Sequence, residues 1–386
     1  MSITAFQSVV QEMSEFRKVL HRHPEIAGCE KWTCAEIRRR LAEIPGVEVL
    51  PPFLETDTVA FIHGNAPGKN VTLRADIDAL TVVEETNCGF ESENPGLMHA
   101  CGHDVHTAVL MGAAKILAAK RNEFSGSIRL VFQPGEENKA MARPLIAAGA
   151  LDNPPADFVA ALHCMPGLEV GKARLRVGAM MSSCVHFEVT FFGQGGHGSR
   201  PHAARNPLIA ACSAVMELQT AVPNRINSQR AGVLSICAIN GGKLDNVIPE
   251  KCSFIGTIRA LDDETASELR TALQDMCQAV AALHRCSCEV HLAEGGYPAT
   301  INSASGVELA KLVLEKCNIG IEEMPESFMA SEDFSYYLNK ASDGVFIMMG
   351  AGVDQPPLHN CRFLADERMI SSGIAYMTEI ALAALK

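Results

Sequence analysis

Apolar, strand-like runs in this chain end repeatedly in side chains that can bind a metal ion or transfer a proton. The three runs, each with its terminal groups, are Val71 to Arg74 with Asp76, Ser127 to Phe132 with Glu136 and Glu137, and Phe158 to Leu162 with His163. In open α/β folds, sites form at the sheet edge where the strands' carboxyl ends meet. A single strand-end His is more often a packed core residue, so the repetition carries the prediction of an α/β fold with a site at that edge.

The densest group of such side chains lies between Met98 and Thr107, which holds three His, one Asp and one Cys. Cys101 and His103 are two residues apart and can reach one ion from a tight turn, because the intervening glycine fits such a turn. An apolar, Ala-rich run follows, and Asp104 is the expected N-cap of the helix that it predicts. Cys101 alone would be read as a small buried hydrophobe. The whole group favours a site at the start of a helix.

The pattern changes near Met180, where the predicted order becomes β-α-β-β-α-β, the ferredoxin-like arrangement. With 386 residues the chain is long enough for two domains. We therefore expect a discontinuous catalytic domain, residues 1–180 and 295–386, and an inserted domain, residues 181–294. A Gly-rich loop in the insert carries His197 but lacks the Lys-Ser/Thr of a nucleotide P-loop. A His on flexible glycines suits contact with a substrate.

Composition narrows the partners. The net charge of −12 disfavours nucleic acid, whose phosphates need basic patches. We expect no signal peptide and no membrane association, because the N-terminus is neither basic nor apolar enough and no apolar run approaches a membrane span. The 14 cysteines are scattered and lack the spacing of a disulfide framework. A reducing cytoplasm and a small-molecule substrate are the expected setting.

The strand-end and loop candidates share donor types that suit borderline divalent ions such as Zn²⁺, Mn²⁺, Ni²⁺ or Co²⁺. They are Asp76, Cys101, His103, Glu136, Glu137, His163 and His359. A structural zinc site would use four closed ligands, whereas dispersed ligands with a spare Glu favour an open, catalytic site. Two ions about 3.5–4 Å apart could share Cys101 or a water, while the spare Glu moves a proton to a leaving amine. This combination hydrolyses amides.

Two other classes of function compete with this interpretation. In the first, Cys101 is a nucleophile with a His base, but this leaves Glu137, His163 and His359 unexplained. In the second, the chain is a metal-sensing or metal-binding module, which explains neither the spare Glu nor His197.

Two further groups are expected to be structural. His21 and His23 are spaced like ligands but follow a predicted helix, Ile3 to Leu20, so a solvated helix end is favoured. Ser331 is the expected N-cap of a later helix.

The ordered set of motifs resembles the N-acyl-amino-acid amidohydrolases (hippurate, indole-acetyl-amino-acid and aminobenzoyl-glutamate hydrolases), a branch of the aminoacylase and carboxypeptidase G clan of metallopeptidases. The resemblance runs nearly end to end. The motifs are Leu20-His21 with Pro24-Glu25, Arg74 to Leu80, Met98 to Thr107, Gln133-Pro134 with Glu136-Glu137, His163 with Pro166, Gly195 to Ser199 with Pro201-His202, Asn246 with Ile248-Pro249, Ser331 to Phe334, and His359 with Phe363.

This resemblance implies a zinc-exopeptidase-like catalytic domain, with a mixed sheet flanked by helices, and a role for each matching residue. The implied ligands of two divalent ions per subunit are Cys101 as the bridge, His103, Glu137, His163 and His359. Glu136 would be the general base, and Asp76 would orient a metal-binding imidazole. His197 would stabilise the oxyanion, in its own or a partner's site.

Substrate and assembly follow from the same resemblance. Asn246 and Arg259 would hold the substrate's carboxylate, and the inserted domain would act as a lid and form a homodimer. The implied reaction is hydrolysis of the amide bond of N-acyl amino acids; a metallo-dipeptidase or carboxypeptidase of the same clan is the alternative. Gly135 stands where the family usually has Ala, and residues 138–142 lack a common glycine, which leaves the acyl group undefined.

Overall fold

The computed structural model describes residues 2–386, and contacts divide this part of the chain into two compact units. The first unit contains residues 2–180, Ile301–Glu326 and Asp333–Lys386; the second contains Met181–Thr300 and Ser327–Glu332. The chain passes between the units within the short strands β7 (Gly178–Met181) and β14 (Thr300–Asn302), and again on either side of Ser327–Glu332. Within residues 2–386, no helix combines the length and the apolar character needed to cross a membrane.

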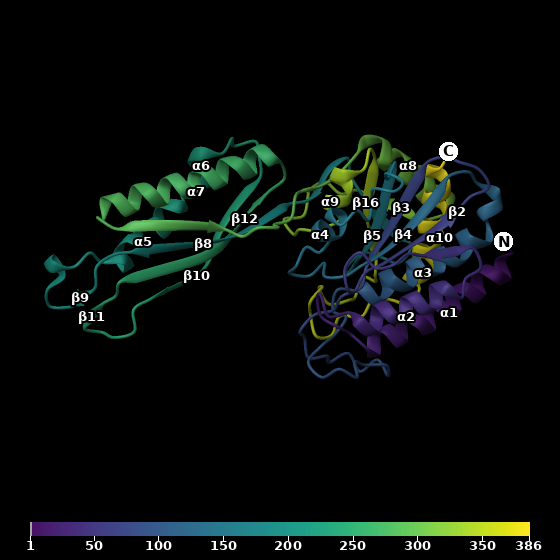
Figure 1. Cartoon of the computed structure of the whole chain (residues 1–386), viewed down its shortest axis with the longest axis horizontal. Helices are drawn as coiled ribbons and strands as arrows, with labels where there is room; N and C mark the ends of the chain where they lie inside the picture. Colours follow the sequence, from purple (N-terminus) through teal and green to yellow (C-terminus); the bar gives the residue numbers. More distant parts are fainter. Residues whose placement is uncertain (1) are drawn as a thin grey trace. The chain divides into compact units, whose positions relative to one another are not determined.

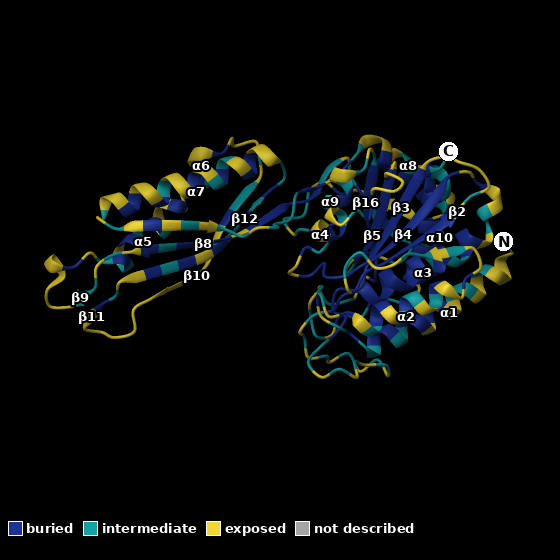
Figure 2. Cartoon of the chain, viewed as in Figure 1, coloured by how far each residue is buried: buried dark blue, intermediate teal, exposed yellow. Residues whose placement is uncertain are grey.

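The first unit is built on a mixed, eight-stranded sheet (Figure 1). Its strands, in spatial order, are β1 (Val47–Val49), β2 (Thr58–His63), β4 (Ser127–Gln133), β3 (Asn70–Asp76), β5 (Phe158–Met165), β16 (Gly344–Gly350), β6 (Lys172–Arg174) and β15 (Gly320–Glu322). The central strands are buried on both faces, as Figure 2 shows in dark blue. Such strands read as continuous apolar runs rather than alternating ones, which is why the sequence marks them clearly.

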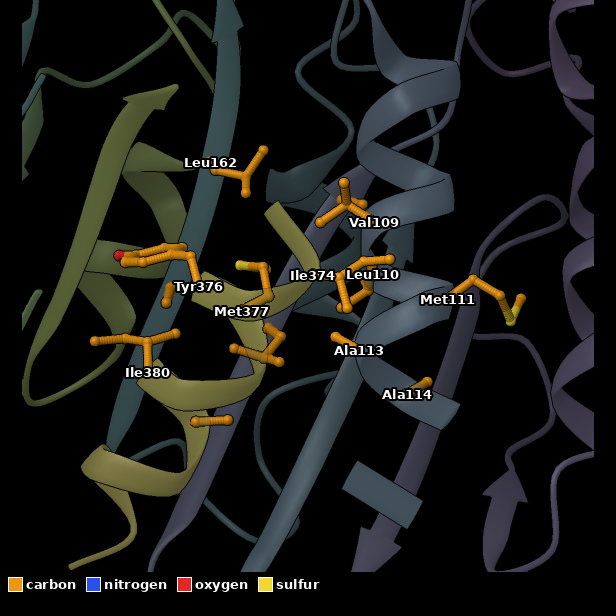
Figure 3. Close-up of a cluster of buried hydrophobic side chains, with 14 of the residues drawn as sticks. Val109, Leu110, Met111, Ala113, Ala114, Leu162, Ile374, Tyr376, Met377 and Ile380 are labelled. Atoms are coloured by element: carbon orange, nitrogen blue, oxygen red, sulfur yellow. The ribbon is translucent and has the colours of Figure 1, made fainter. Parts of the chain in front are cut away.

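Helices cover this sheet. They are α1 (Ile3–Arg22), α2 (Lys31–Ala42), α3 (His103–Ala119), α4 (Ala142–Ala147), α8 (Ala304–Lys316), α9 (Ser335–Lys340) and α10 (Met369–Ala384), with a 3₁₀ turn at Arg121–Glu123. Helices α3 and α10 pack closely in the main core (Figure 3). A Cβ at Gly112 would overlap Ile374, and one at Gly373 would overlap Val109. These two glycines therefore let the helices approach, which fixes the start of α3 against the sheet.

Four neighbouring strands, β4, β3, β5 and β16, run parallel. Their carboxyl ends therefore meet at one edge of the sheet. In the register of β3 and β4, Asp76 lies opposite Gln133, so Asp76 and the Glu pair that follows β4 emerge side by side. His163 lies near the end of β5. The predicted strand-end placement is confirmed for this part of the fold.

The second unit is a four-stranded antiparallel sheet in the order β10-β12-β8-β13. Its elements along the chain are β8 (Ser183–Phe192), β9 (Gly196–His197), a 3₁₀ turn (Pro201–Ala203), α5 (Pro207–Leu218), α6 (Ala221–Arg225), β10 (Gly232–Gly241), β11 (Val247–Ile248), β12 (Lys251–Ala260), α7 (Asp263–Leu283) and β13 (Ser287–Leu292). The three helices share one apolar core with the sheet. This is the predicted ferredoxin-like order, so the α/β fold class with an α+β insert is confirmed.

Two expected helix starts are wrong. Helix α3 follows Gly102, which has a left-handed φ of 83°, and no side chain caps it. Asp104 lies in its first turn instead, because its carboxylate is bound by Arg17. The helix expected from Ser331 begins only at Ser335, the first residue of α9, and no side chain caps it.

Candidate active site

His103 opens α3 and is fully buried. Its Nδ1 lies 2.9 Å from the backbone oxygen of Asp78 and 3.2 Å from Oδ1 of the same residue. A carbonyl oxygen only accepts, so Nδ1 carries a proton and donates it. The opposite nitrogen, Nε2, is buried without a hydrogen-bonding partner. A buried ring nitrogen without a protein partner, on an imidazole oriented through its other nitrogen, is the arrangement of a metal-ligating histidine.

Asp78 therefore orients His103. Its Oδ2 also accepts the backbone N–H of Glu137 at 2.9 Å. One buried carboxylate thus connects a candidate ligand on α3 with a candidate ligand after β4. The expectation that Asp76 orients a metal-binding imidazole fits the structure less well, because Asp76 Oδ2 is 3.7 Å from His103 Nε2.

Asp76 instead binds His106, with Oδ1 2.6 Å from Nδ1. The Nε2 of His106 accepts the backbone N–H of Cys164 at 2.9 Å. Both nitrogens of His106 are thereby engaged, which leaves no lone pair for an ion even though His106 lies among donors. His106 is thus a buried structural residue whose hydrogen bond to Cys164 joins α3 to the end of β5.

His163 and Cys101 face each other across the edge. Nδ1 of His163 donates to the Cys164 carbonyl at 2.8 Å, and its Nε2 lies 3.4 Å from Cys101 Sγ. Because the proton is on Nδ1, the Nε2 lone pair points toward the thiol. These two groups come from β5 and from the loop before α3, so the structure brings together a thiol and an imidazole 62 residues apart.

The Glu pair after β4 completes the cluster. Glu137 groups with Cys101 and His359, and it also groups with His103 and Glu136; within each group the donor atoms lie within 4.8 Å of one another. His359 Nε2 is 3.0 Å from Glu137 Oε1. His359 has a φ of 65°, and its backbone N–H donates to the Ala100 carbonyl at 2.8 Å, which fixes the backbone of this exposed residue.

The local field favours positive charge at this edge. Burial alone would lower the pKa of His103, but the carboxylates of Asp76 and Asp78 raise it to about 10. Burial and a neighbouring imidazole lower the pKa of His163 to about 3, so this side chain is neutral near pH 7. A site that stabilises a cation and also offers neutral imidazole nitrogen has the donor chemistry of a divalent metal centre.

Cys101 is a poor free nucleophile in this environment. Burial, and then the negative charges of Glu137 and Glu136, raise its pKa well above the ordinary value. A reactive cysteine needs the opposite, an electropositive surrounding that lowers the thiol pKa. A nearby divalent cation would stabilise the thiolate and make Cys101 a ligand.

A buried arginine that sequence reasoning passed over supports the acidic side of the cluster. Arg74 donates Nη1 to Asp76 at 2.7 Å and Nη2 to Asp333 at 2.8 Å. Gln133 Nε2 also donates to Asp333, at 2.8 Å and 2.9 Å to its two oxygens. The planar guanidinium thus fixes two carboxylates at once. An arginine inside an apolar strand was the one available signal for this network.

His21 is not a solvated helix end, so that expectation is wrong. It is 1% exposed, with Nδ1 2.9 Å from Asp104 and Nε2 3.1 Å from Glu84. Burial alone would lower its pKa, but the hydrogen bonds to these two carboxylates raise it. His23, by contrast, stacks on Trp32 with ring centroids 4.2 Å apart.

In the second unit, His197 and Asn246 lie together. Strands β9 and β11 pair His197 with Val247, and the Gly198 N–H donates to the Asn246 carbonyl at 2.7 Å. Arg259 lies near the other end of β12, opposite Cys184, and its Nη1 donates to the Met329 carbonyl at 2.8 Å.

The sequence matches the model of peptidase family M20/M25/M40 over residues 72–383. Thermostable carboxypeptidase 2 of Saccharolobus solfataricus is 33% identical over 366 residues, 93% of this chain and 92% of that protein. The N-acetyl-L-cysteine deacetylase of Bacillus subtilis is 34% identical over 371 residues, 96% of this chain and 88% of that one. A Bacillus subtilis structure described as a dinuclear metal binding peptidase from the M20 family has a TM-score of 0.86 at 30% identity, and the match covers 98% of this chain and 99% of that chain.

Proposed function

This chain belongs to peptidase family M20/M25/M40, and from that premise we propose that it is a metal-dependent amidohydrolase that cleaves the bond between an acyl group and an amino acid. Family membership confirms the resemblance expected from the sequence. The observation that carries the proposal is the pair Glu136-Glu137. Glu137 groups with the thiol and imidazole donors, while Glu136 lies next to it at the same edge. One carboxylate can hold ions while its neighbour transfers a proton.

We assign five residues as the ligands of two divalent ions: Cys101, His103, Glu137, His163 and His359. Support comes from the unpartnered Nε2 of His103 and from the Nε2 lone pair of His163. The mixture of thiolate, imidazole and carboxylate suits Zn²⁺, Mn²⁺, Ni²⁺ or Co²⁺. Ions of this class polarise a substrate carbonyl and make water acidic enough to attack it near neutral pH.

Glu136 is the proposed general base and acid. It takes the proton of the attacking water and delivers it to the leaving amine, a role that contributes about 10²–10⁴-fold in related chemistry. The backbone N–H of Asp333 lies 3.4 Å from Glu136 Oε1. Asp76 acts at one remove: through His106 it fixes the Cys164 backbone, and hence the strand end that carries His163.

His197 is the proposed oxyanion donor. Its Nδ1 lies 3.1 Å from the backbone nitrogen of Ser199, whose N–H donates to it. In neutral His197 the proton must then be on Nε2. This tautomer presents an N–H to solvent, which is the group that can stabilise a developing oxyanion.

The place of His197 within its unit supports a shared site in a homodimer. Lys251 begins β12 near His197 and Asn246, and Arg259 lies eight residues further along, roughly 27 Å away at about 3.4 Å per residue. The chain enters the unit at the Arg259 end, where Ser183 pairs with Ala260. We propose that Arg259 holds the substrate carboxylate in its own subunit, whereas His197 and Asn246 serve the partner's site.

A carboxypeptidase or dipeptidase activity is the second candidate, because a carboxypeptidase shares 33% identity over most of the chain. It would use the same residues on a peptide bond. We place the enzyme in the cytoplasm, since all 14 cysteines within residues 2–386 are free thiols.

A substrate panel tests the proposal. Acetyl-, benzoyl- and arylacetyl-amino acids, together with dipeptides, would be assayed with Zn²⁺, Mn²⁺, Ni²⁺ and Co²⁺ in turn. We expect metal-dependent release of the free amino acid from an N-acyl substrate. Preferential cleavage of dipeptides would favour the second candidate, and no hydrolysis with any metal would refute both.

Mixed subunits test the shared site. Glu136→Gln and His197→Ala, each inactive alone, should recover about a quarter of wild-type activity after random re-association into a two-fold dimer. No recovery in a mixture shown to contain heterodimers would place His197 in its own subunit's site.

A further inference from the structure

The buried carboxylate of Glu30, in the N-terminal segment, lies against the turn of residues 135–137, which carries the proposed base Glu136. Glu30 has no exposed surface. Its Oε1 accepts the backbone N–H of Gly135 at 2.8 Å and that of Gly28 at 2.9 Å, while its Oε2 accepts the Thr56 hydroxyl at 2.9 Å. Three neutral donors thus hold one carboxylate that is 105 residues from the turn in sequence.

The turn before the base is fixed from both sides. Gly135, with a φ of 61°, binds Glu30, and Glu137 donates its backbone N–H to Asp78 at 2.9 Å. The Gly135 carbonyl also accepts the Met141 N–H at 3.1 Å. Glu136 lies between the two N–H anchors. Its backbone position is therefore set by carboxylates from two different segments, not by the turn alone.

We propose that Glu30 is a positioning residue that holds the turn so that the Glu136 carboxylate meets the attacking water. This inference rests on the function proposed for Glu136. Proton transfer requires a heavy-atom distance of about 2.6–3.2 Å. A displacement of about 1 Å that originates away from the reacting atoms can cost about 100-fold in rate, so an anchor directly before Glu136 affects turnover more than substrate binding.

Two substitutions separate the hydrogen bonds from the charge. In Glu30→Gln the amide oxygen still accepts both N–H groups, and the amide NH₂ can donate to the Thr56 hydroxyl. Glu30→Ala leaves the Gly28 and Gly135 N–H groups buried without acceptors. We expect Glu30→Ala to lower kcat about 10- to 100-fold with KM changed less than about threefold, and Glu30→Gln to restore most of kcat. Metal content should stay at the wild-type level in both, because the hydrogen-bond partners of the Glu30 carboxylate are Gly135, Gly28 and Thr56, and none of them is an assigned ligand.

Glu25 supplies a matched control from the same segment. Its carboxylate accepts the N–H groups of Trp32 and Thr33 at 3.1 Å and 2.8 Å and the Thr33 hydroxyl at 2.9 Å. Its side chain thus serves the start of α2 in the way that Glu30 serves the turn. Glu25→Ala should lower the Tm but leave kcat unchanged. If Glu25→Ala loses as much kcat as Glu30→Ala at an equal Tm loss, Glu30 is only structural and the inference is overturned.

Amide hydrogen exchange gives a readout that needs no substrate. Exchange at Gly135 in the intact, metal-loaded protein should be faster in Glu30→Ala than in wild type, and unchanged in Glu25→Ala. If the wild type cleaves no member of the substrate panel, the proposed function fails while exchange still tests the anchor. Unchanged protection of Gly135 in Glu30→Ala overturns the inference in either case.

Discussion

Asp78 connects two assigned metal ligands but is not assigned as a ligand itself. Its removal should therefore weaken metal binding indirectly. Asp78→Ala deletes the Oδ1 contact to His103 Nδ1 at 3.2 Å and the Oδ2 acceptor of the Glu137 N–H at 2.9 Å. The backbone carbonyl of Asp78 still accepts from His103 at 2.9 Å. The imidazole therefore keeps its tautomer but loses one of its two restraints, and Glu137 loses its anchor.

The size of the effect follows from these contacts. Groups that orient a metal ligand are worth about 10- to 100-fold in metal affinity, equivalent to about 1.4–2.8 kcal/mol. The assay is competition between the protein and a chromophoric chelator for Zn²⁺, with the Tm recorded in parallel. We expect Asp78→Ala to bind Zn²⁺ within this range more weakly than wild type.

Asp57 is a matched control because, like Asp78, it has a fully buried carboxylate. This carboxylate accepts two backbone N–H groups. Those groups belong to Phe53, at 3.1 Å, and Leu54, at 2.5 Å, and neither is a site residue. Asp57→Ala should lose stability but keep wild-type metal affinity. Equal Zn²⁺ affinity in wild type and Asp78→Ala would refute the orienting role of Asp78.

Three further predictions concern the frame of the site. Gly102→Ala should lower the free energy of unfolding by about 2–4 kcal/mol, the sum of left-handed strain and overlap with Cys164 Sγ; chemical denaturation measures it, and a loss below about 1 kcal/mol would contradict it. Arg74→Met removes the guanidinium that binds two buried carboxylates and should cost about 3–5 kcal/mol in the same assay, whereas a neutral result would contradict its structural role. The pKa of His21 is raised in the folded state. The difference in unfolding free energy between wild type and His21→Gln should therefore be largest below pH 6.5 and shrink as the pH rises through the raised pKa. A difference that grows with pH would contradict this.

Much of the candidate site could be predicted, because its residues follow strands that have a recognisable local sequence pattern. The buried parallel strands give apolar runs, and Glu136, Glu137 and His163 stand at or just past their ends. The order of elements in the second unit was likewise readable, since each strand and helix has its own periodicity.

The supporting contacts could not be predicted, because they join segments that are distant in the chain. Asp78 meets Glu137 across 59 residues, and Arg74 meets Asp333 across 259. The periodicity of residues within one helix or strand carries no information about such pairs. The expectation of a solvated His21 was wrong for the same reason. Its partner Glu84 lies in a loop 63 residues later in the chain and helps to bury it. The sequence therefore located the candidate ligands and the candidate base, but not the contacts that hold them in place.

The central claim is that Glu136 transfers the proton while its neighbours hold the ions. Glu136→Gln keeps the size of the side chain and removes its basicity, and the most direct measurement is kcat together with metal content on one preparation. We expect wild-type metal content with kcat lowered by about 10²–10⁴-fold. Turnover that remains at the wild-type level with full metal content would contradict it.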